Sequence, residues 1–297
     1  MKRIILLGTL TILLLSAVLA SPTYAEPDRA TDVEITPKIT IKGPKAQGKP
    51  LKQAATGILG EALQKGAQKY AIVIGISDYN GTENDIQYAD DDAKDMVNAL
   101  TTIYGFQREN IILLISDYQV NNATKEDIID AISKLSDKVK NGDEVVFFYS
   151  GHGARGKAND GDNELIDEAI VPYECTAESL IWDGELAQMF SKFKTSRIIF
   201  IFDSCYAGGM NDLKADGRIV AMACSESGLS YEFGNLQNGQ FTYYFVEEGI
   251  LNGNADIYDQ IPEQPDVTVE EAFDYAKANC NYQTPTISDS FKNDLLP

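Results

Sequence analysis

The sequence predicts an α/β protein in which helices cover a mostly parallel sheet. Hydrophobic residues make up 44% and charged residues 24% of the 297-residue chain, as in an ordinary globular protein. Several short runs are apolar throughout, which is typical of strands buried on both faces. Amphipathic helical patterns separate these runs, and that alternation predicts α/β architecture.

The regular elements are expected to begin near residue 70. Apolar runs predict strands at 70–76, 110–115, 144–149, 197–202 and 218–224. Apolar residues at helical spacing predict helices over 91–104 and from Thr124, as N-cap, to about Val139. A capping box, Thr268 to Glu271, opens a last helix. Because sites in parallel sheets form at the carboxyl ends of strands, functional residues are expected directly after the runs.

The N-terminus has the pattern of a secretory signal peptide. Lys2 and Arg3 precede an apolar run over 4–15, and small residues then lead to Ala20 or Ala25. We therefore expect residues 1–25 to be a signal peptide and the protein to be secreted or otherwise extracytoplasmic. The alternative, an uncleaved anchor, needs about 20 apolar residues, and this run is at the short end even when it is counted to Ala20. No stable membrane insertion is expected after cleavage.

Residues 26–67 predict a leader or pro-segment without ordered structure, followed by one domain over 68–297. Prolines and glycines interrupt the leader, and its lysines recur without a periodic apolar face. The net charge is −20, yet the leader is mildly basic, so the acidity lies in the domain. Such a domain repels nucleic acid and suits basic partners or divalent cations, and the basic leader could lie on it.

The four cysteines, 175, 205, 224 and 280, have no CxxC spacing. The sequence around Cys205, described below, sets it apart from the others. The remaining three cysteines can form at most one disulfide, for which Cys175 and Cys280 are candidates. One histidine and scattered cysteines do not make a zinc ligand set.

Two predicted strand ends carry the candidate catalytic residues. The run at 144–149 leads into Ser150-Gly-His152-Gly153, and the run at 197–202 into Asp203-Ser-Cys205. If the two strands are parallel neighbours, His152 and Cys205 meet at one edge. An imidazole can give a thiol thiolate character and then protonate a leaving amine. The backbone N–H groups of Gly153 and Cys205 suit an oxyanion hole.

The alternative for each residue is structural, since a cysteine after a strand is often a small buried hydrophobe. Here the chain's only histidine and the cysteine both lie in glycine-containing turns at strand ends, which favours catalysis.

Several segments resemble the caspase-like clan of cysteine peptidases, in particular metacaspases and related microbial enzymes. They are KYAIVIGISDY, YADDDAKDM, FFYSGHGARG, DEAIVPYE, IIFIFDSCYAGG and VAMACSESGLSYE. DSCYAGG stands where caspases proper have another pentapeptide, which tells against aspartate specificity. The resemblance implies a three-layer caspase-like fold and an endopeptidase that works through a thioester acyl-enzyme.

The resemblance also implies a specificity pocket formed by Asp92, Ser150 and Asp203. Carboxylates at the bottom of a pocket select Arg or Lys by charge pairing. We therefore expect protein or peptide substrates cleaved after a basic residue. For Asp92 alone, the favourable position of an acid at a helix N-terminus is a sufficient alternative explanation.

The chemistry requires no cofactor, but the resemblance implies calcium as an activator. Asp167, Asp183 and Asp212 match ligand positions, whereas Gly184 stands where a second acid is expected. The acidic run at 160–168 supplies further oxygens, which calcium prefers. The alternative is a solvated acidic loop.

Related enzymes are often zymogens, so self-cleavage is expected at a basic residue of the leader or of the loop after Cys205. The candidates are Lys49, Lys52, Lys65, Lys69, Lys214 and Arg218. Two other functions stay open: a same-clan peptidase with another preference (legumain-like for Asn, clostripain-like or gingipain-like), and a non-catalytic caspase-like binding module. A monomer is the expected state.

Overall fold

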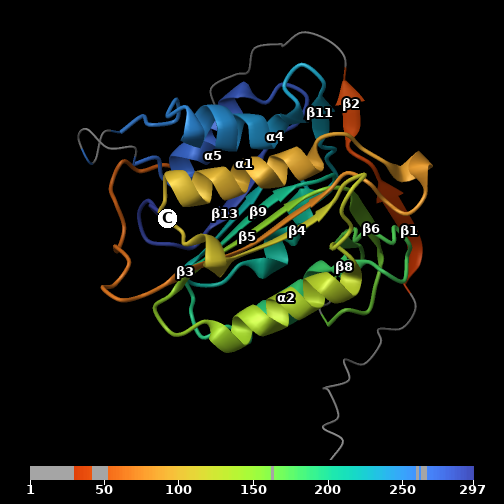
Figure 1. The fold of residues 1–297 in the computed structure, drawn as a ribbon, viewed down its shortest axis with the longest axis horizontal. Coiled ribbons are helices and arrows are strands. Elements are labelled where there is room, and N and C mark those ends of the chain that lie inside the picture. The colour runs from red at the N-terminus through yellow and green to blue at the C-terminus, as the bar shows by residue number, and fades with distance from the viewer. Residues whose placement is uncertain (1–29, 42–52, 162–163, 259–260, 262–265) are drawn as a thin grey trace, which may run out of the picture.

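The computed structural model describes residues 30–41, 53–161, 164–258, 261 and 266–297 (Figure 1). A six-stranded sheet forms its centre, in the order β13-β10-β9-β5-β3-β4. Only β13 is antiparallel to its neighbour. The strands are β3 (Lys69–Ile76), β4 (Ile111–Ser116), β5 (Glu144–Ser150), β9 (Ile198–Asp203), β10 (Arg218–Met222) and β13 (Thr286–Asp289). The prediction of an α/β fold with a mostly parallel central sheet is confirmed.

Helices cover both faces of this sheet. Figure 1 shows α1, α4 and α5 on one face and α2 on the other. The α-helices are α1 (Ala89–Thr102), α2 (Lys125–Lys138), α3 (Asp183–Phe190), α4 (Gln240–Thr242) and α5 (Val269–Asn279). A π-helical segment, Tyr243–Leu251, continues α4, and 3-10 turns occur at Thr82–Asn84, Arg108–Asn110 and Ala207–Leu213.

Two hydrophobic cores fill the space between the sheet and its helices. Side chains alternate along each strand, so that Ile72 of β3 packs in the core with Ile132 of α2. Val73 packs in the opposite core with Met96 of α1 and Phe273 of α5. This two-sided burial explains why the strands are apolar throughout and could be predicted from the sequence.

The helix caps also agree with the sequence. Thr124 accepts a hydrogen bond from the Asp127 N–H in a capping box, and Thr268 does the same with Glu271. Each satisfies a backbone donor that the first helical turn leaves without a partner.

Two smaller sheets are built on the leader. One has the order β1-β6-β7-β8 and the other β12-β11-β2. Their strands are β1 (Thr31–Thr36), β2 (Ile39–Ile41), β6 (Gly153–Lys157), β7 (Asp167–Ile170), β8 (Ile181–Trp182), β11 (Tyr231–Phe233) and β12 (Asn238–Gly239). The leader strands thus lie beside segments far away in the sequence, at the right of Figure 1.

The prediction that the leader lacks order is wrong for residues 31–36 and 39–41. Val33, Ile35, Ile39 and Ile41 alternate with polar residues over this stretch, a short strand pattern among prolines and lysines, and the strands pair with β6 and β11. The predicted signal peptide, residues 1–25, and the leader lysines 49 and 52 lie outside the described residues.

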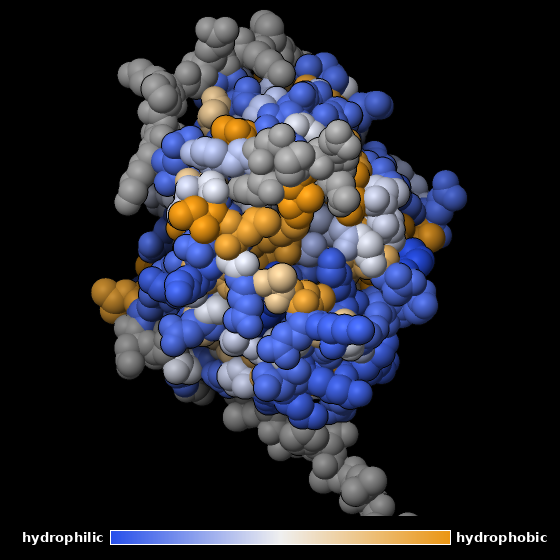
Figure 2. All heavy atoms as spheres, turned by 90° about the vertical axis from the view of Figure 1, so that its left-hand side faces the viewer, coloured by the Kyte–Doolittle hydropathy of each residue, from blue (hydrophilic) through white to orange (hydrophobic). Residues whose placement is uncertain are grey.

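All four cysteines are free, so a disulfide between Cys175 and Cys280 is absent. No described helix combines the length and the apolar composition needed to span a membrane. The face seen in Figure 2 is largely hydrophilic, with one central group of apolar side chains.

Candidate active site

The ends of β5 and β9 place the two candidate catalytic residues at one edge of the sheet. The strands are parallel neighbours, and Ser150 pairs with Asp203. His152 and Cys205 each follow two residues later. Gly153 lies directly against the Cys205 backbone, because a side chain at position 153 would collide with the Cys205 carbonyl group. The two turns that the sequence singled out are therefore in contact.

The imidazole of His152 is held by two residues that sequence reasoning did not select. It stacks on the Tyr79 ring, with centroids 4.1 Å apart and planes 3° from parallel. The backbone N–H of His152 donates to the Tyr79 hydroxyl at 2.8 Å, and the ring atom Nε2 lies 2.6 Å from the Asn84 carbonyl oxygen. Because a carbonyl only accepts, we assign the ring proton to Nε2, which leaves Nδ1 as the basic nitrogen.

Burial keeps this imidazole neutral. It lowers the pKa of His152 to about 4, against the opposing effect of the Asn84 hydrogen bond. Nδ1 is buried and has no hydrogen-bond partner within the described part of the chain. A neutral imidazole with a free lone pair is what a general base requires.

The thiol of Cys205 is protonated and engaged by backbone groups. It donates to the Pro37 carbonyl oxygen at 3.4 Å and accepts from the Ser230 N–H at 3.3 Å. Burial raises the pKa of Cys205 to about 11. Among the described residues, no hydrogen bond joins the thiol to His152. With the leader in place, the Cys205 thiol is thus engaged by backbone groups rather than by the His152 imidazole.

The three residues predicted for the specificity pocket do come together. Asp92 lies in the first turn of α1, while Ser150 and Asp203 end β5 and β9. All three are fully buried. The Ser150 hydroxyl donates to Asp92 at 2.6 Å, and the Gly239 N–H donates to the other carboxylate oxygen at 2.8 Å. The oxyanion-hole roles of Gly153 and Cys205 stay predictions.

Lys38, between β1 and β2, fills this pocket. Its ammonium nitrogen lies 3.1 Å from Asp92 and 3.1 Å from Asp203, and it donates to Ser150 at 2.8 Å. Its side chain is fully buried. Burial lowers the pKa of Lys38, but Asp203 and Asp92 outweigh this effect and hold the pKa above its ordinary value. Lys38 is thus charged, with two carboxylates around it.

Asp203 is fixed by neighbours that the sequence did not indicate. It accepts from the hydroxyl of Ser230 at 2.6 Å and from the hydroxyl of Thr242 at 2.7 Å. The Thr242 N–H adds a third hydrogen bond, at 3.0 Å. These donors compensate for burial of the carboxylate and orient it toward the pocket.

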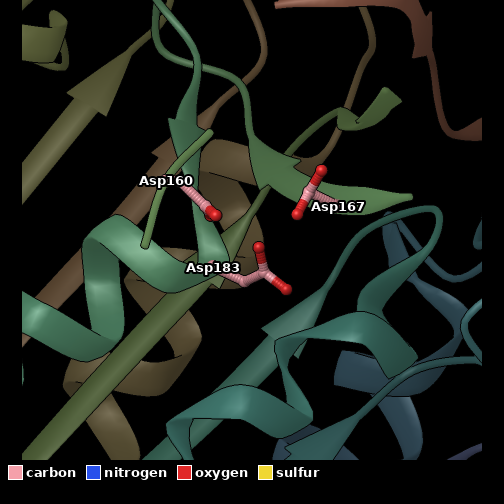
Figure 3. Close-up of side chains that lie close together, drawn as sticks. All are labelled: Asp160, Asp167 and Asp183. Carbon is pink, nitrogen blue, oxygen red and sulfur yellow. The ribbon is translucent and has the colours of Figure 1, made fainter. Parts of the chain in front are cut away.

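Carboxylates also gather in a second group, and Figure 3 shows Asp160, Asp167 and Asp183 pointing toward one another. Oxygens of these three lie within 4.8 Å of one another, and so do oxygens of Glu164, Asp183 and Asp212. Asp183 therefore belongs to both groups. Of the predicted metal ligands, Asp167 and Asp212 each approach Asp183, but in different groups.

Asp160 occupies the space of the acid that is missing at position 184. Its carboxylate accepts from the Gly184 N–H at 2.9 Å, and a side chain on Gly184 would lie 2.6 Å from the same oxygen. Burial raises the pKa of Asp183 to about 10, and the neighbouring Asp160 and Glu168 add to the shift. Such mutually repelling, buried oxygens fit a hard divalent cation.

Comparison with known proteins shows similarity to one family. Residues 69–214 match the family described as the metacaspase, peptidase C14 domain. Metacaspase-4 of Arabidopsis thaliana is 36% identical over 148 residues, which are 48% of this chain and 34% of that protein. Metacaspase-1 of Candida glabrata is 33% identical over 166 residues, 54% of this chain and 42% of that protein.

The fold has a counterpart among solved structures. The crystal structure of protein GSU0716 from Geobacter sulfurreducens superposes with a TM-score of 0.54 at 19% identity. The match covers 74% of this chain and 92% of that one. At this identity the likeness concerns the fold alone.

Residues 69–214 thus resemble the cysteine-peptidase domains of the caspase-like clan. Within that clan, the similarity over 69–214 is to the metacaspase type. The chain spans less than half the length of these curated relatives, 34% and 42%.

Proposed function

We propose that the protein is a cysteine endopeptidase that cleaves after Lys or Arg and is held latent by its leader. The observation that carries the proposal is Lys38, whose ammonium group is buried between Asp92 and Asp203. A pocket that holds one lysine with two carboxylates and a hydroxyl group has the chemistry to hold the basic residue of a substrate.

In the proposed reaction, His152 Nδ1 takes the thiol proton as Cys205 Sγ attacks the substrate carbonyl carbon. The N–H groups of Gly153 and Cys205 would stabilise the oxyanion. His152 then protonates the leaving amine, and the C–N bond breaks to give a thioester. Water, deprotonated by His152, attacks the thioester, and the acid product leaves as the Cys205 thiol re-forms.

A substrate profile tests the specificity. In the Lys38→Ala full chain, peptides with Arg or Lys before the scissile bond should be cleaved at least about 100-fold better than Asn or Asp peptides, because only a cation satisfies the two carboxylates. Asp203→Asn should lower kcat/KM for the Arg peptide at least tenfold. The exposed Asp137→Asn is the control. A preference for Asn or Asp would refute the pocket and favour another peptidase of the clan.

The leader fills the pocket without presenting the right peptide bond. The leader carbonyl that contacts the thiol is that of Pro37, one residue before Lys38. Cleavage after Lys38 would require the Lys38 carbonyl at Sγ. The next residue is fixed as well, since the Ile39 N–H donates to the Ser230 carbonyl at 3.0 Å. This arrangement supports inhibition by the leader rather than cleavage at Lys38.

Processing is proposed at other basic residues. Lys65 and Lys214 are exposed, whereas Lys69 begins β3 and Arg218 donates to the Leu213 carbonyl at 3.0 Å. During incubation, the wild type should gain N-termini after Lys65 or Lys214, and Cys205→Ala should not. Identical fragmentation of both would contradict self-processing. Secretion, proposed from the N-terminal pattern, predicts that the exported protein starts at residue 21 or 26.

We also propose a calcium site at the carboxylate cluster. Asp160, Asp167 and Asp183 would hold the ion, and Glu164 or Asp212 could complete its oxygen ligands. A bound divalent ion would relieve the repulsion among these buried acids. The replacement of the missing acid at position 184 by Asp160 supports the fit of this set.

Calcium removal and mutation test this site. At 100 times its Kd, calcium should stabilise the fold by about 2.7 kcal/mol, which is roughly 5–10 °C in Tm. Asp183→Asn should abolish this increase, because it removes the acid common to both groups, and Asp137→Asn should preserve it. An equal rise in Asp183→Asn would place calcium elsewhere, and no rise in the wild type would remove the site.

A further inference from the structure

Arg155 of β6 and Tyr206, which follows Cys205, form a pair of side chains that the proposed catalytic mechanism does not use. β6 lies between β1 and β7, with Glu34 of β1 opposite Arg155 and Thr36 opposite Gly153. When β1 leaves, β6 becomes an open edge strand. An open edge binds extended peptides through its backbone, and pockets along it read their side chains.

The Glu34 carboxylate is held at this edge by three donors. Arg155 donates from Nε at 3.0 Å and from Nη2 at 2.8 Å, both to the same oxygen. The Tyr206 hydroxyl donates to the other oxygen at 3.2 Å. Together, these bonds recognise both oxygens of one carboxylate.

The two residues that bind Glu34 are fixed by other contacts. The Arg155 guanidinium lies over the Tyr206 ring, 4.6 Å from its centroid. Tyr206 directly follows Cys205, is buried and has a left-handed backbone with φ of 59°. Its N–H donates to the Gly228 carbonyl at 2.9 Å. Tyr206 is thus positioned by the same turn that presents the nucleophile.

The leader contacts the Arg155–Tyr206 pair and the pocket at the same time. Side chains two residues apart in an extended strand share a face. Thr36 and Tyr206 hydroxyls lie 2.9 Å apart, next to the Glu34 contact, and Lys38 lies in the pocket two residues further on. Glu34 and Thr36 therefore contact Tyr206 from one face of β1, and Lys38 enters the pocket two residues beyond the end of that strand.

We propose that Arg155 and Tyr206 form a second binding subsite, for the carboxylate of a Glu or Asp four residues before the pocket lysine. The ligand is an extended acidic-to-basic peptide that adds to β6. Its basic residue is assigned through the proposed specificity, but the subsite needs no catalysis. The alternative is an exposed ion pair that merely fastens the leader, since Arg155 and Glu34 are 39% and 53% exposed. The hydrogen bond from Tyr206 to the second Glu34 oxygen, and the shared face of Glu34 and Thr36, favour recognition.

Binding of the leader sequence in trans tests the proposal independently of activity. The full chain with Glu34→Ala and Lys38→Ala, which empties both sites, is titrated against a labelled peptide of residues 31–41 by fluorescence anisotropy. A peptide with Gln in place of Glu34 should bind about five- to tenfold more weakly. Arg155→Ala in this protein should bind both peptides equally, and Tyr206→Phe should reduce the preference.

Two further variants separate recognition from folding. Lys157→Ala removes the neighbouring ion pair to Asp32, which is 56% and 66% exposed, and should leave the preference intact. Arg155→Lys keeps the charge but loses the second donor, and should retain part of the preference. Equal binding of the two peptides, an unchanged preference in Arg155→Ala, or no binding of the labelled peptide would overturn the subsite. Absence of hydrolysis with intact peptide preference would refute only the proposed activity.

Discussion

Replacing Lys38 by alanine in the full chain is expected to raise the rate of hydrolysis of a small Arg substrate by about 100-fold. Removing one partner from a buried ion pair costs about 3–5 kcal/mol, and 3 kcal/mol shifts the equilibrium between a closed and an open site by roughly 100-fold. The measurement is the initial rate with a fluorogenic Arg peptide, together with the Tm. The Tm should fall, because Asp92 and Asp203 then face each other without a cation.

Two variants check that this effect comes from the pocket. Lys38→Arg keeps a cation between the carboxylates and should stay latent. Lys157→Ala removes only an exposed pair on the same sheet and should change the rate less than threefold. If Lys38→Ala were as inactive as the wild type while remaining folded, the leader would not be what inhibits the enzyme.

Alanine at Cys205 or His152, introduced into the Lys38→Ala protein, is expected to lower kcat by at least about 1000-fold. The first change removes the nucleophile and the second removes the base at Nδ1. Cys224→Ala is the matched control, because Cys224 is also buried and its thiol donates to the Ser204 carbonyl at 3.3 Å. Full activity in Cys205→Ala would refute the mechanism, whereas absence of hydrolysis in the Lys38→Ala protein itself would leave the binding module as the alternative.

The reactivity of the Cys205 thiol should also change when Lys38 is replaced by alanine. With a pKa of about 11 in the latent form, the Cys205 thiolate fraction rises tenfold per pH unit between pH 7 and 9, and alkylation should follow it. Release of the leader removes part of the burial that raises this pKa. Alkylation of Lys38→Ala should therefore be faster at pH 7 and depend less on pH.

The parts of the molecule that the sequence predicts are those whose signal is local. Central strands such as β5 and β9 are apolar along their whole length because both faces are buried, and Thr124 caps its helix through residues three positions away. His152 and Cys205 could be paired because parallel neighbouring strands end at the same edge. The pocket residues came from a family resemblance and not from any local pattern.

The parts that escape prediction depend on distant partners. β1 pairs with the distant β6, and the short alternation of Val33 and Ile35 is its only local signal. Asn84 acts through its backbone carbonyl, which every residue type possesses. The Asp160 carboxylate lies at Gly184, where the resemblance implies an acid, but it comes from a distant position in the sequence. Lys38 was one of several leader lysines, and nothing local distinguishes the one that enters the pocket.

The pairing of Ser150 with Asp203 has a consequence for how this enzyme could change. At the end of each strand, a proposed pocket residue lies two positions before a candidate catalytic residue, and the register pairs Ser150 with Asp203. Under the proposed roles, selectivity and chemistry depend on the same two strand ends, so the exchange of one loop would alter both. With these proposed roles, a new preference would arise through side-chain replacement at positions 92, 150 or 203, while the backbone of the two turns stays the same.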